Sequence, residues 1–230
     1  MGVVVEFCGE RHPVTTGRPF TIGRQGDLVV DDNPFLHRRF LQIAFQRDLW
    51  WLTNLGSQLS ATVADDAGTV QSWLAPGARV PLVFARSTVW FTAGPTTYEI
   101  DVHCDEPPFS VAGTERAAVG DTTCGRASLT PEQRLLLVAL AEPVLRRRVP
   151  GPVDCPTSAE AAARLGWAVT KFNRKLDYVC HKLEKLGVRG LHGDPDRLAR
   201  DRKARLVEYA LATRLVVPAD VALLQDRGER

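Results

Sequence analysis

Long apolar runs, lysines and methionines are scarce in this chain. Its 230 residues include one methionine, and residues 1–110 contain no lysine. No apolar run approaches the roughly 20 residues that a membrane-spanning helix needs. The first apolar run lacks the preceding basic residues of a signal peptide and ends early at Glu6, so we expect residues 3–7 to form a strand. The sequence therefore predicts a protein without a membrane partner.

Paired cysteines and catalytic signatures are also missing. The five cysteines are an odd number and form no CxxC pair, which argues against a disulfide framework and against a zinc site. The chain has no Gly-rich phosphate loop followed by Lys-Ser/Thr, no GxSxG and no HExxH. We therefore expect a cytoplasmic, non-enzymatic protein with reduced thiols and with neither a metal nor a cofactor.

The net charge of +2 conceals a division between the two halves of the chain. Residues 1–110 carry 8 Arg against 12 acidic residues, a net charge of −4, whereas residues 111–230 carry 21 Lys and Arg against 15 acidic residues, a net charge of +6. Opposite signs suggest two modules with different partners. Residues 164–205 hold 12 basic and 5 acidic residues, an excess typical of a protein that binds a phosphate backbone.

The first hundred residues have the pattern of a β-sandwich. Short runs rich in Val, Ile, Leu, Phe and Trp alternate with Gly, Pro and Asp turn signals, and no helical periodicity interrupts them. The expected strands are residues 3–7, 19–23, 28–30, 40–46, 49–55, 61–64, 70–74, 80–84, 88–92 and 98–102.

Three segments of this region resemble a forkhead-associated (FHA) domain: PFTIGRQGDLVVDD, NPFLHRRFLQIAF and LWWLTNLGSQLSATV. The resemblance covers residues 3–102 and rests on the strand order and on the motifs Ile22-Gly23-Arg24 and Leu55-Gly56-Ser57. It implies a sandwich of about a hundred residues, with apical loops that bind phosphothreonine peptides. The residues that it places in such a site are Arg24, His37, Arg38 and Ser57.

The chain departs from the FHA pattern at three positions. Where the family has Ser-Arg-x-His, with serine bonding the phosphate and histidine bracing the loop, this chain has His37-Arg38-Arg39-Phe40. The family's peptide-holding asparagine is replaced by Leu59. Arg24 is retained, and a guanidinium suits phosphate because its planar fork makes two charge-assisted bonds.

Two interpretations of the sandwich follow. In the first, Arg24, His37, Arg38 and Arg39 form a basic pocket that still takes a phosphate or another anion. In the second, phosphopeptide binding is lost and the sandwich is a scaffold. Arg24 would then be a surface residue paired with Asp27, Asp31 or Asp32.

Residues 106–128 read as a flexible linker, because Pro, Gly, Ser and Thr replace apolar periodicity there. Such a linker lets two modules move relative to each other. Helix resumes at Thr130-Pro131-Glu132-Gln133, where threonine can cap and proline occupies the first helical position. Residues 129–217 are expected to form a helical domain, followed by a tail over 218–230.

Residues 156–183 predict a helix-turn-helix. Thr157 or Ser158 can cap a first helix with Glu160 as the capping-box acid, and Gly166 breaks that helix. A second helix starts near Thr170 and is followed by glycines at 187–193 that suggest a small wing. Its apolar stripe at helical period consists of Phe172, Leu176, Val179 and Leu183. The unit resembles the helix-turn-helix attached to FHA-like domains in some actinobacterial proteins.

The opposite face of this second helix carries the side chains that we expect to contact double-stranded DNA. Helix-turn-helix proteins place the front of the second helix in the major groove, where Arg, Lys and Asn reach bases and phosphates. The predicted contacts are Thr170, Lys171, Asn173, Arg174, Lys175 and Tyr178. The sequence thus favours a DNA-binding regulator whose sandwich recruits a protein, phosphorylated on threonine in the first interpretation. The alternative is an adaptor in which both modules bind proteins.

Overall fold

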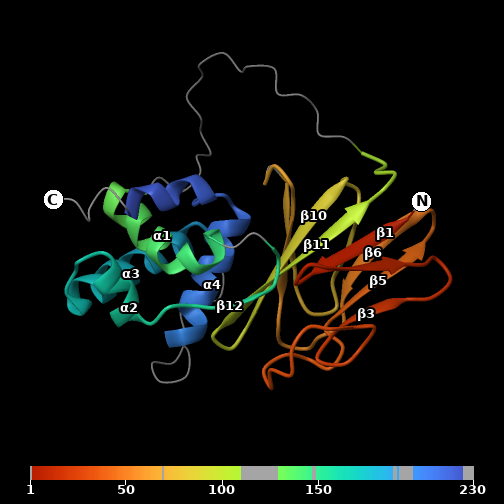
Figure 1. Cartoon of the computed structure of the whole chain (residues 1–230), viewed down its shortest axis with the longest axis horizontal. Coiled ribbons are helices and arrows are strands. Elements are labelled where there is room, and N and C mark those ends of the chain that lie inside the picture. The colour runs from red at the N-terminus through yellow and green to blue at the C-terminus, as the bar shows by residue number, and fades with distance from the viewer. Residues whose placement is uncertain are drawn as a thin grey trace, which may run out of the picture.

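The protein has a β-sandwich followed by a cluster of helices packed against one of its sheets (Figure 1). This computed structural model describes residues 2–68, 70–109, 129–146, 149–188, 191 and 199–224, without the side chains of 199–201. No helix in these ranges is both long and apolar enough to cross a bilayer.

The sandwich consists of two sheets. The first has the order β2-β1-β11-β10-β7-β8 and the second β4-β3-β5-β6-β9. The strands are β1 (Val3–Phe7), β2 (Glu10–Val14), β3 (Phe20–Gly23), β4 (Leu28–Val29), β5 (Leu41–Gln46), β6 (Leu49–Asn54), β7 (Ala61–Asp65), β8 (Gln71–Leu74), β9 (Arg79–Pro81), β10 (Arg86–Ala93) and β11 (Thr96–Cys104).

Alternating apolar residues from both sheets form one core, as expected for a sandwich. Its largest fully buried members are Trp50, Tyr98, Phe40 and Phe91. The rings of Phe40 and Phe91 meet edge to face with centroids 4.8 Å apart, and Phe91 stacks on Tyr98 at 5.0 Å. The ten strands expected from the sequence are all present, with ends that differ by a few residues.

The helical part contains four α-helices and a 3-10 helix among the described residues. These are α1 (Pro131–Leu145), α2 (Ser158–Arg164), α3 (Val169–Lys185), α4 (Ala199–Ala212) and η1 (Pro218–Leu224). Thr130 caps α1 in a capping box with Gln133, and Thr157 caps α2 in a second one with Glu160, as the sequence indicates. Gly166 lies between α2 and α3 with φ +65°, a conformation that glycine adopts readily.

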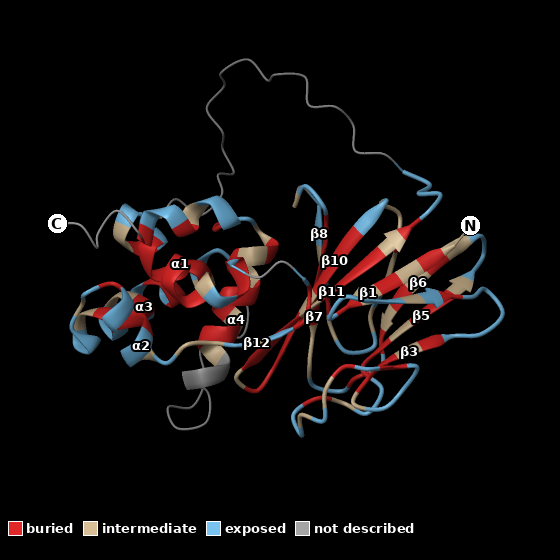
Figure 2. Ribbon diagram, viewed as in Figure 1, coloured by how far each residue is buried: buried red, intermediate tan, exposed pale blue. Residues whose placement is uncertain are grey.

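Helices α1–α3 share one apolar core, in which α3 buries the stripe that the sequence predicts. Phe172, Leu176, Val179 and Leu183 of α3 are buried, together with Ala161 and Ala162 of α2. Figure 2 shows buried residues concentrated inside this cluster and along the strands that face it. The expected wing falls on residues of which 189–190 and 192–193 lie outside the described ranges, as do 110–128 of the expected linker.

The sequence led us to expect modules that move independently, whereas in the structure the two parts are joined by a shared sheet. Strand β12 (Pro152–Asp154), between α1 and α2, pairs antiparallel with β11 of the sandwich. The backbone N–H groups of Cys8 and Glu99 donate to Pro150 and Gly151, which extends the connection on both sides. No pattern in the sequence predicts β12, because a strand of three residues is too short to show alternation.

Helix α4 lies on β7, β10 and β11, and its contact with them includes a buried carboxylate. Glu208 is 1% exposed and accepts hydrogen bonds from Thr62 Oγ1 at 2.8 Å, Thr92 Oγ1 at 3.0 Å and Arg205 at 2.6 Å. The guanidinium of Arg205 also lies 3.9 Å from the centre of a Trp73 ring. The outer face of the first sheet is therefore covered by the protein's own helix.

Candidate functional site

Three apical loops, residues 24–27, 30–40 and 55–60, meet at one end of the sandwich. Backbone hydrogen bonds hold the first two together, from Arg24 N to His37 O at 3.0 Å and from Gln25 N to Arg38 O at 2.7 Å. The third is joined to them by Leu55 N, which donates to Phe40 O at 2.8 Å. The loops after β3 and β4 lie at the lower end of the sandwich in Figure 1, away from the N-terminus.

Gly23 permits this close approach. A Cβ atom at Gly23 would lie 2.5 Å from the carbonyl oxygen of Arg38 and 2.8 Å from that of His37. Real Cβ atoms are not found so close to backbone atoms, so the loop that carries His37 and Arg38 can lie here only beside glycine. The glycine of the Ile22-Gly23-Arg24 motif thus sets the geometry of the loops.

Arg24, the residue expected to contact phosphate, is half-buried between these loops. Its Nε is buried and has no hydrogen-bond partner among the described residues. The three acids named as its alternative partners are not ion-paired to it. Asp27 pairs with Arg18 at 2.5 Å, Asp31 accepts from Tyr98, and Asp32 forms no ion pair with a described residue. A buried donor without an acceptor is costly, so Arg24 is suited to receive one from outside.

His37 is oriented toward the third loop in this structure. Its Nε2 accepts a hydrogen bond from Ser57 N at 3.0 Å and lies 3.2 Å from Ser57 Oγ. The ring stacks on Phe40 with centroids 5.9 Å apart. His37 therefore braces the Leu55-Gly56-Ser57 turn, the task that the resemblance assigns to a histidine at the position of Phe40, while Phe40 itself is buried in the core.

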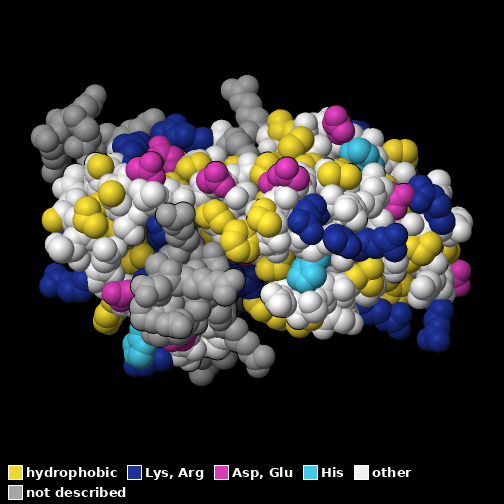
Figure 3. All heavy atoms as spheres, turned by 90° about the horizontal axis from the view of Figure 1, so that it is seen from below, with side chains coloured by type: hydrophobic (Ala, Val, Ile, Leu, Met, Phe, Trp, Pro, Cys, Tyr) yellow, Lys and Arg dark blue, Asp and Glu magenta, His cyan; other side chains and the backbone are white. Residues whose placement is uncertain are grey.

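Arg38 and Arg39 add positive charge to this end of the molecule. Both are exposed, and neither forms an ion pair with a described residue. Figure 3 views the molecule from below and shows Lys and Arg side chains gathered beside a histidine on the sandwich half. Because the sandwich has a net charge of −4 over residues 1–110, this basic end is a local feature that favours an anionic ligand.

Two asparagines fix the loops, and sequence reasoning did not identify either. Asn54 is fully buried, donates to Leu59 O at 2.8 Å and Leu74 O at 3.0 Å, and accepts from Gly56 N at 2.8 Å. Asn33 donates to Ala93 O at 3.0 Å and Tyr98 Oη at 2.8 Å. Burial raises the pKa of Tyr98, which keeps its hydroxyl protonated as the donor to Asp31. The sequence singles out Asn54 only because asparagine is uncommon in apolar strands such as β6.

The predicted DNA-contacting residues lie on the outward face of α3, which is far from the sandwich in Figure 1. Thr170, Asn173 and Arg174 are exposed, and Tyr178 is 64% exposed. The first turn of α3 has no side-chain cap, since Ala168 occupies the N-cap position. This face is polar and accessible, as the helix-turn-helix prediction requires.

Lys171 and Lys175, two of the predicted DNA contacts, form ion pairs within the protein. Both bind Glu132 in the first turn of α1, Lys171 at 3.2 Å and Lys175 at 2.5 Å. Lys171 Nζ also lies 4.5 Å from the centre of a Trp167 ring. Hydrogen bonds from Lys175 and Lys171 hold the pKa of Glu132 below its ordinary value. Glu132 was expected only as a residue of a helix start, because the sequence does not show which helices meet.

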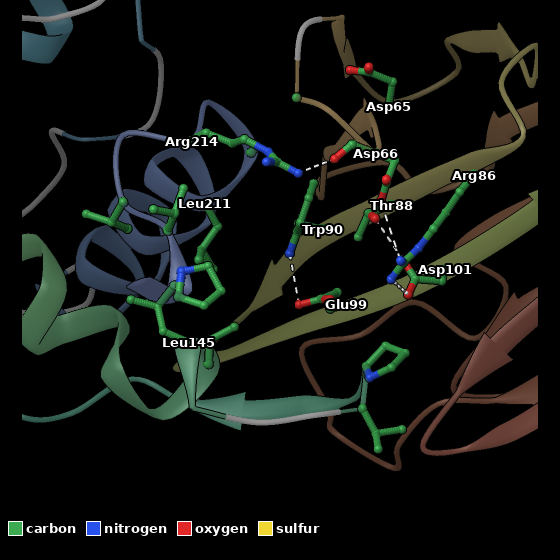
Figure 4. Close-up of a pocket in the computed structure, with 18 residues that line it drawn as sticks. Asp65, Asp66, Arg86, Thr88, Trp90, Glu99, Asp101, Leu145, Leu211 and Arg214 are labelled. Carbon is green, nitrogen blue, oxygen red and sulfur yellow. Dashed lines mark hydrogen bonds and ion pairs between the residues drawn. The ribbon is translucent and has the colours of Figure 1, made fainter. Parts of the chain in front are cut away.

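A further hollow of about 330 Å³ lies between the sandwich and the helices (Figure 4). Its charged side chains are already paired within the protein. Arg86 binds Asp101 at 2.7 Å, Trp90 Nε1 donates to Glu99 at 3.2 Å, and Arg214 donates to the backbone oxygen of Asp66. The hollow therefore belongs to the contact between the two parts.

Comparison with known proteins finds similarity for the sandwich only at the level of solved structures. No family model and no curated protein matches the chain. The Mycobacterium tuberculosis Rv1747 FHA-1 domain aligns with 44% of this chain and 94% of its own, at 16% identity and a TM-score of 0.34. The FHA domain of an Arabidopsis thaliana hypothetical protein aligns with 48% of this chain and 91% of its own, at 19% identity and a TM-score of 0.35. A chain from a study of phosphothreonine-dependent FHA domain interactions aligns with 46% of this chain and 99% of its own, at 20% identity and a TM-score of 0.33.

Proposed function

We propose that the apical loops bind a phosphothreonine-containing segment of a protein partner. The observation that carries this proposal is the buried, unpartnered Nε of Arg24 between loops that also present Arg38 and Ser57. A phosphate oxygen at this position would satisfy the donor, and the planar guanidinium would bind it more strongly than a neutral donor does. Because the backbone N–H of Ser57 already donates to His37, the phosphate is held chiefly by arginine.

Binding of a phosphothreonine peptide library to the full chain tests this function. Arg24→Lys keeps the positive charge but loses the planar fork, so we expect at least about tenfold weaker binding. Arg79→Lys, in β9, makes the same exchange in a side chain that lies over Trp51 and is the matched control. Absence of binding by the wild type, or equal binding of phosphorylated and unphosphorylated peptides, contradicts the proposal and favours the scaffold interpretation.

The second function that we propose is binding of double-stranded DNA through α3. Its support is the exposed polar face of α3, which lies at the end of the molecule opposite the sandwich and is preceded by the capped helix α2. Thr170, Asn173, Arg174 and Tyr178 face solvent there. With the two sites on separate surfaces, the protein would be a regulator that holds a phosphorylated partner beside DNA.

The salt dependence of DNA affinity tests this second function. A protein that neutralises several phosphates loses affinity steeply as salt rises, with a log–log slope of about −0.9 for each phosphate. We expect Arg174→Gln to weaken binding and to reduce the slope by about one, whereas Arg79→Gln leaves both unchanged. If the full chain does not bind even at low salt, the DNA-binding function fails and the adaptor becomes the leading alternative.

A further inference from the structure

A groove separates the first turn of α1 from the exposed face of α3. Thr130, Pro131, Glu132 and Gln133 form one wall, and Arg174, Lys175 and Tyr178 form the other, around a volume of about 570 Å³. Most of the surface exposed inside the groove is apolar, its charged groups belong to Glu132, Arg174 and Lys175, and it opens on the face proposed to meet DNA. Two of its seven lining residues are cations, and one is an acid.

Glu132 forms ion pairs that join the two walls of this groove. Its two carboxylate oxygens bind one lysine each, Oε1 to Lys171 at 3.2 Å and Oε2 to Lys175 at 2.5 Å. All three side chains are between 26% and 40% exposed, so water and ions reach them. An exposed ion pair contributes little to stability and exchanges readily for another partner of the same sign.

We propose that the groove receives a backbone phosphate of DNA, and that Glu132 is the clamp which this phosphate displaces from Lys171 and Lys175. This inference rests on the proposed DNA-binding function and assigns the lysines a second partner. Arg174 and Lys175 both line the groove, and Arg174 is the more exposed of the two, so a phosphate between the walls has two cations within the same wall. Glu132 has the same sign as the phosphate, so its carboxylate must leave the lysines as the phosphate binds.

The clamp has a consequence for selectivity. While Glu132 holds both lysines, the three side chains together carry one net positive charge instead of two. A polyanion that binds by charge alone gains little affinity from one net positive charge. A DNA duplex that also contacts Asn173 and Arg174 can offset the cost of displacing Glu132 through these additional contacts. Glu132 is thereby a residue that lowers nonspecific affinity.

DNA titrations of the full chain across a salt series test the clamp, using a random-sequence duplex as the probe. Glu132→Gln removes the competing charge, so we expect at least about threefold tighter binding near 50 mM salt and a slope steeper by about one to two. Glu10→Gln, on β2 of the sandwich, changes the net charge equally and is the matched control. Thermal unfolding confirms that each variant is folded.

The outcomes separate the clamp from the function on which it rests. Tighter and more salt-sensitive binding by Glu132→Gln alone supports the clamp. The clamp is overturned if the wild type binds DNA and a folded Glu132→Gln variant binds with the same or lower affinity. Glu132 would then hold the lysines for structural reasons. No binding by either protein at any salt concentration overturns the DNA-binding function together with the clamp.

Discussion

Glu208 of α4 accepts a hydrogen bond from Thr62 Oγ1 of β7 at 2.8 Å, although 146 residues separate them in sequence. Burial raises the pKa of Glu208, and Arg205 and the two threonine hydroxyls oppose this effect. A carboxylate so deeply buried persists only where its partners are in place. The pair therefore marks a contact that exists only when the helical part and the sandwich are docked.

Replacement of Glu208 by alanine is expected to destabilise the protein. It leaves the partly buried Arg205 and the buried hydroxyls of Thr62 and Thr92 without Glu208 as their acceptor, at a cost of about 3 kcal/mol in the free energy of unfolding. Chemical denaturation followed by tryptophan fluorescence measures this. Glu10→Ala, at an exposed position, serves as the control, and an equally small effect of both variants would show that α4 does not depend on this carboxylate.

A methyl group at Gly23 is expected to disturb the apical loops. The Cβ of Gly23→Ala would lie 2.5 Å from Arg38 O, and the loop must move to relieve this. We expect a loss of about 1–3 kcal/mol in stability together with weaker phosphopeptide binding. Gly17→Ala is the matched control, because its added methyl group has nothing within 4 Å. Full peptide affinity in Gly23→Ala would mean that the loop position is irrelevant to the site.

The ion pairs of Glu142 with Arg146 and Arg164 predict a pH dependence of stability. Burial alone would raise the pKa of Glu142, but hydrogen bonds from Arg164 and Arg146 outweigh it and hold the pKa below the ordinary value of 4.5. A lowered pKa contributes stability above pH 4.5, and this contribution is lost as the pH falls through the folded-state pKa. Unfolding of Glu142→Gln should therefore differ from wild type at pH 7 and approach it near pH 3. A constant difference across this range would contradict the assignment.

The cysteines should differ sharply in reactivity. Burial raises the pKa of Cys155 and of Cys180 to about 11, and it also raises the pKa of Cys104. These thiols stay protonated at pH 8 and are poor nucleophiles, whereas Cys8 is exposed. Thiol labelling at pH 8 followed by peptide mass spectrometry should modify Cys8 before Cys104, Cys155 and Cys180. Rapid labelling of Cys180 in the folded protein would contradict the burial of this thiol by α3 and its neighbours.

Local patterns were sufficient to predict most elements of the fold. Alternation identified the strands of the sandwich, the two capping boxes located the starts of α1 and α2, and the stripe from Phe172 to Leu183 identified the inner face of α3. Strand β2 was missed because Glu10, Arg11 and Pro13 obscure any alternation. These successes depend on interactions within a few residues.

Contacts between distant segments were beyond such patterns. Nothing near Glu132 in the sequence indicates that it meets Lys171 and Lys175, and nothing near Glu208 indicates two threonines of the sandwich. The contact between His37 and Ser57 is similar, because which ring reaches Ser57 depends on the path of the loop. Site residues could be nominated from motifs, but their partners required the three-dimensional arrangement.

The pairing of β12 with β11 changes what a fragment of this chain would be. A cut after the sandwich would leave the Thr96–Tyr98 edge without its neighbour and would uncover Thr62, Thr92 and Trp73 beneath α4. An open strand edge beside a newly bared surface invites association with other chains. An affinity measured on such a fragment would refer to a protein with an altered surface. The unit on which binding and folding can be compared is the undivided chain.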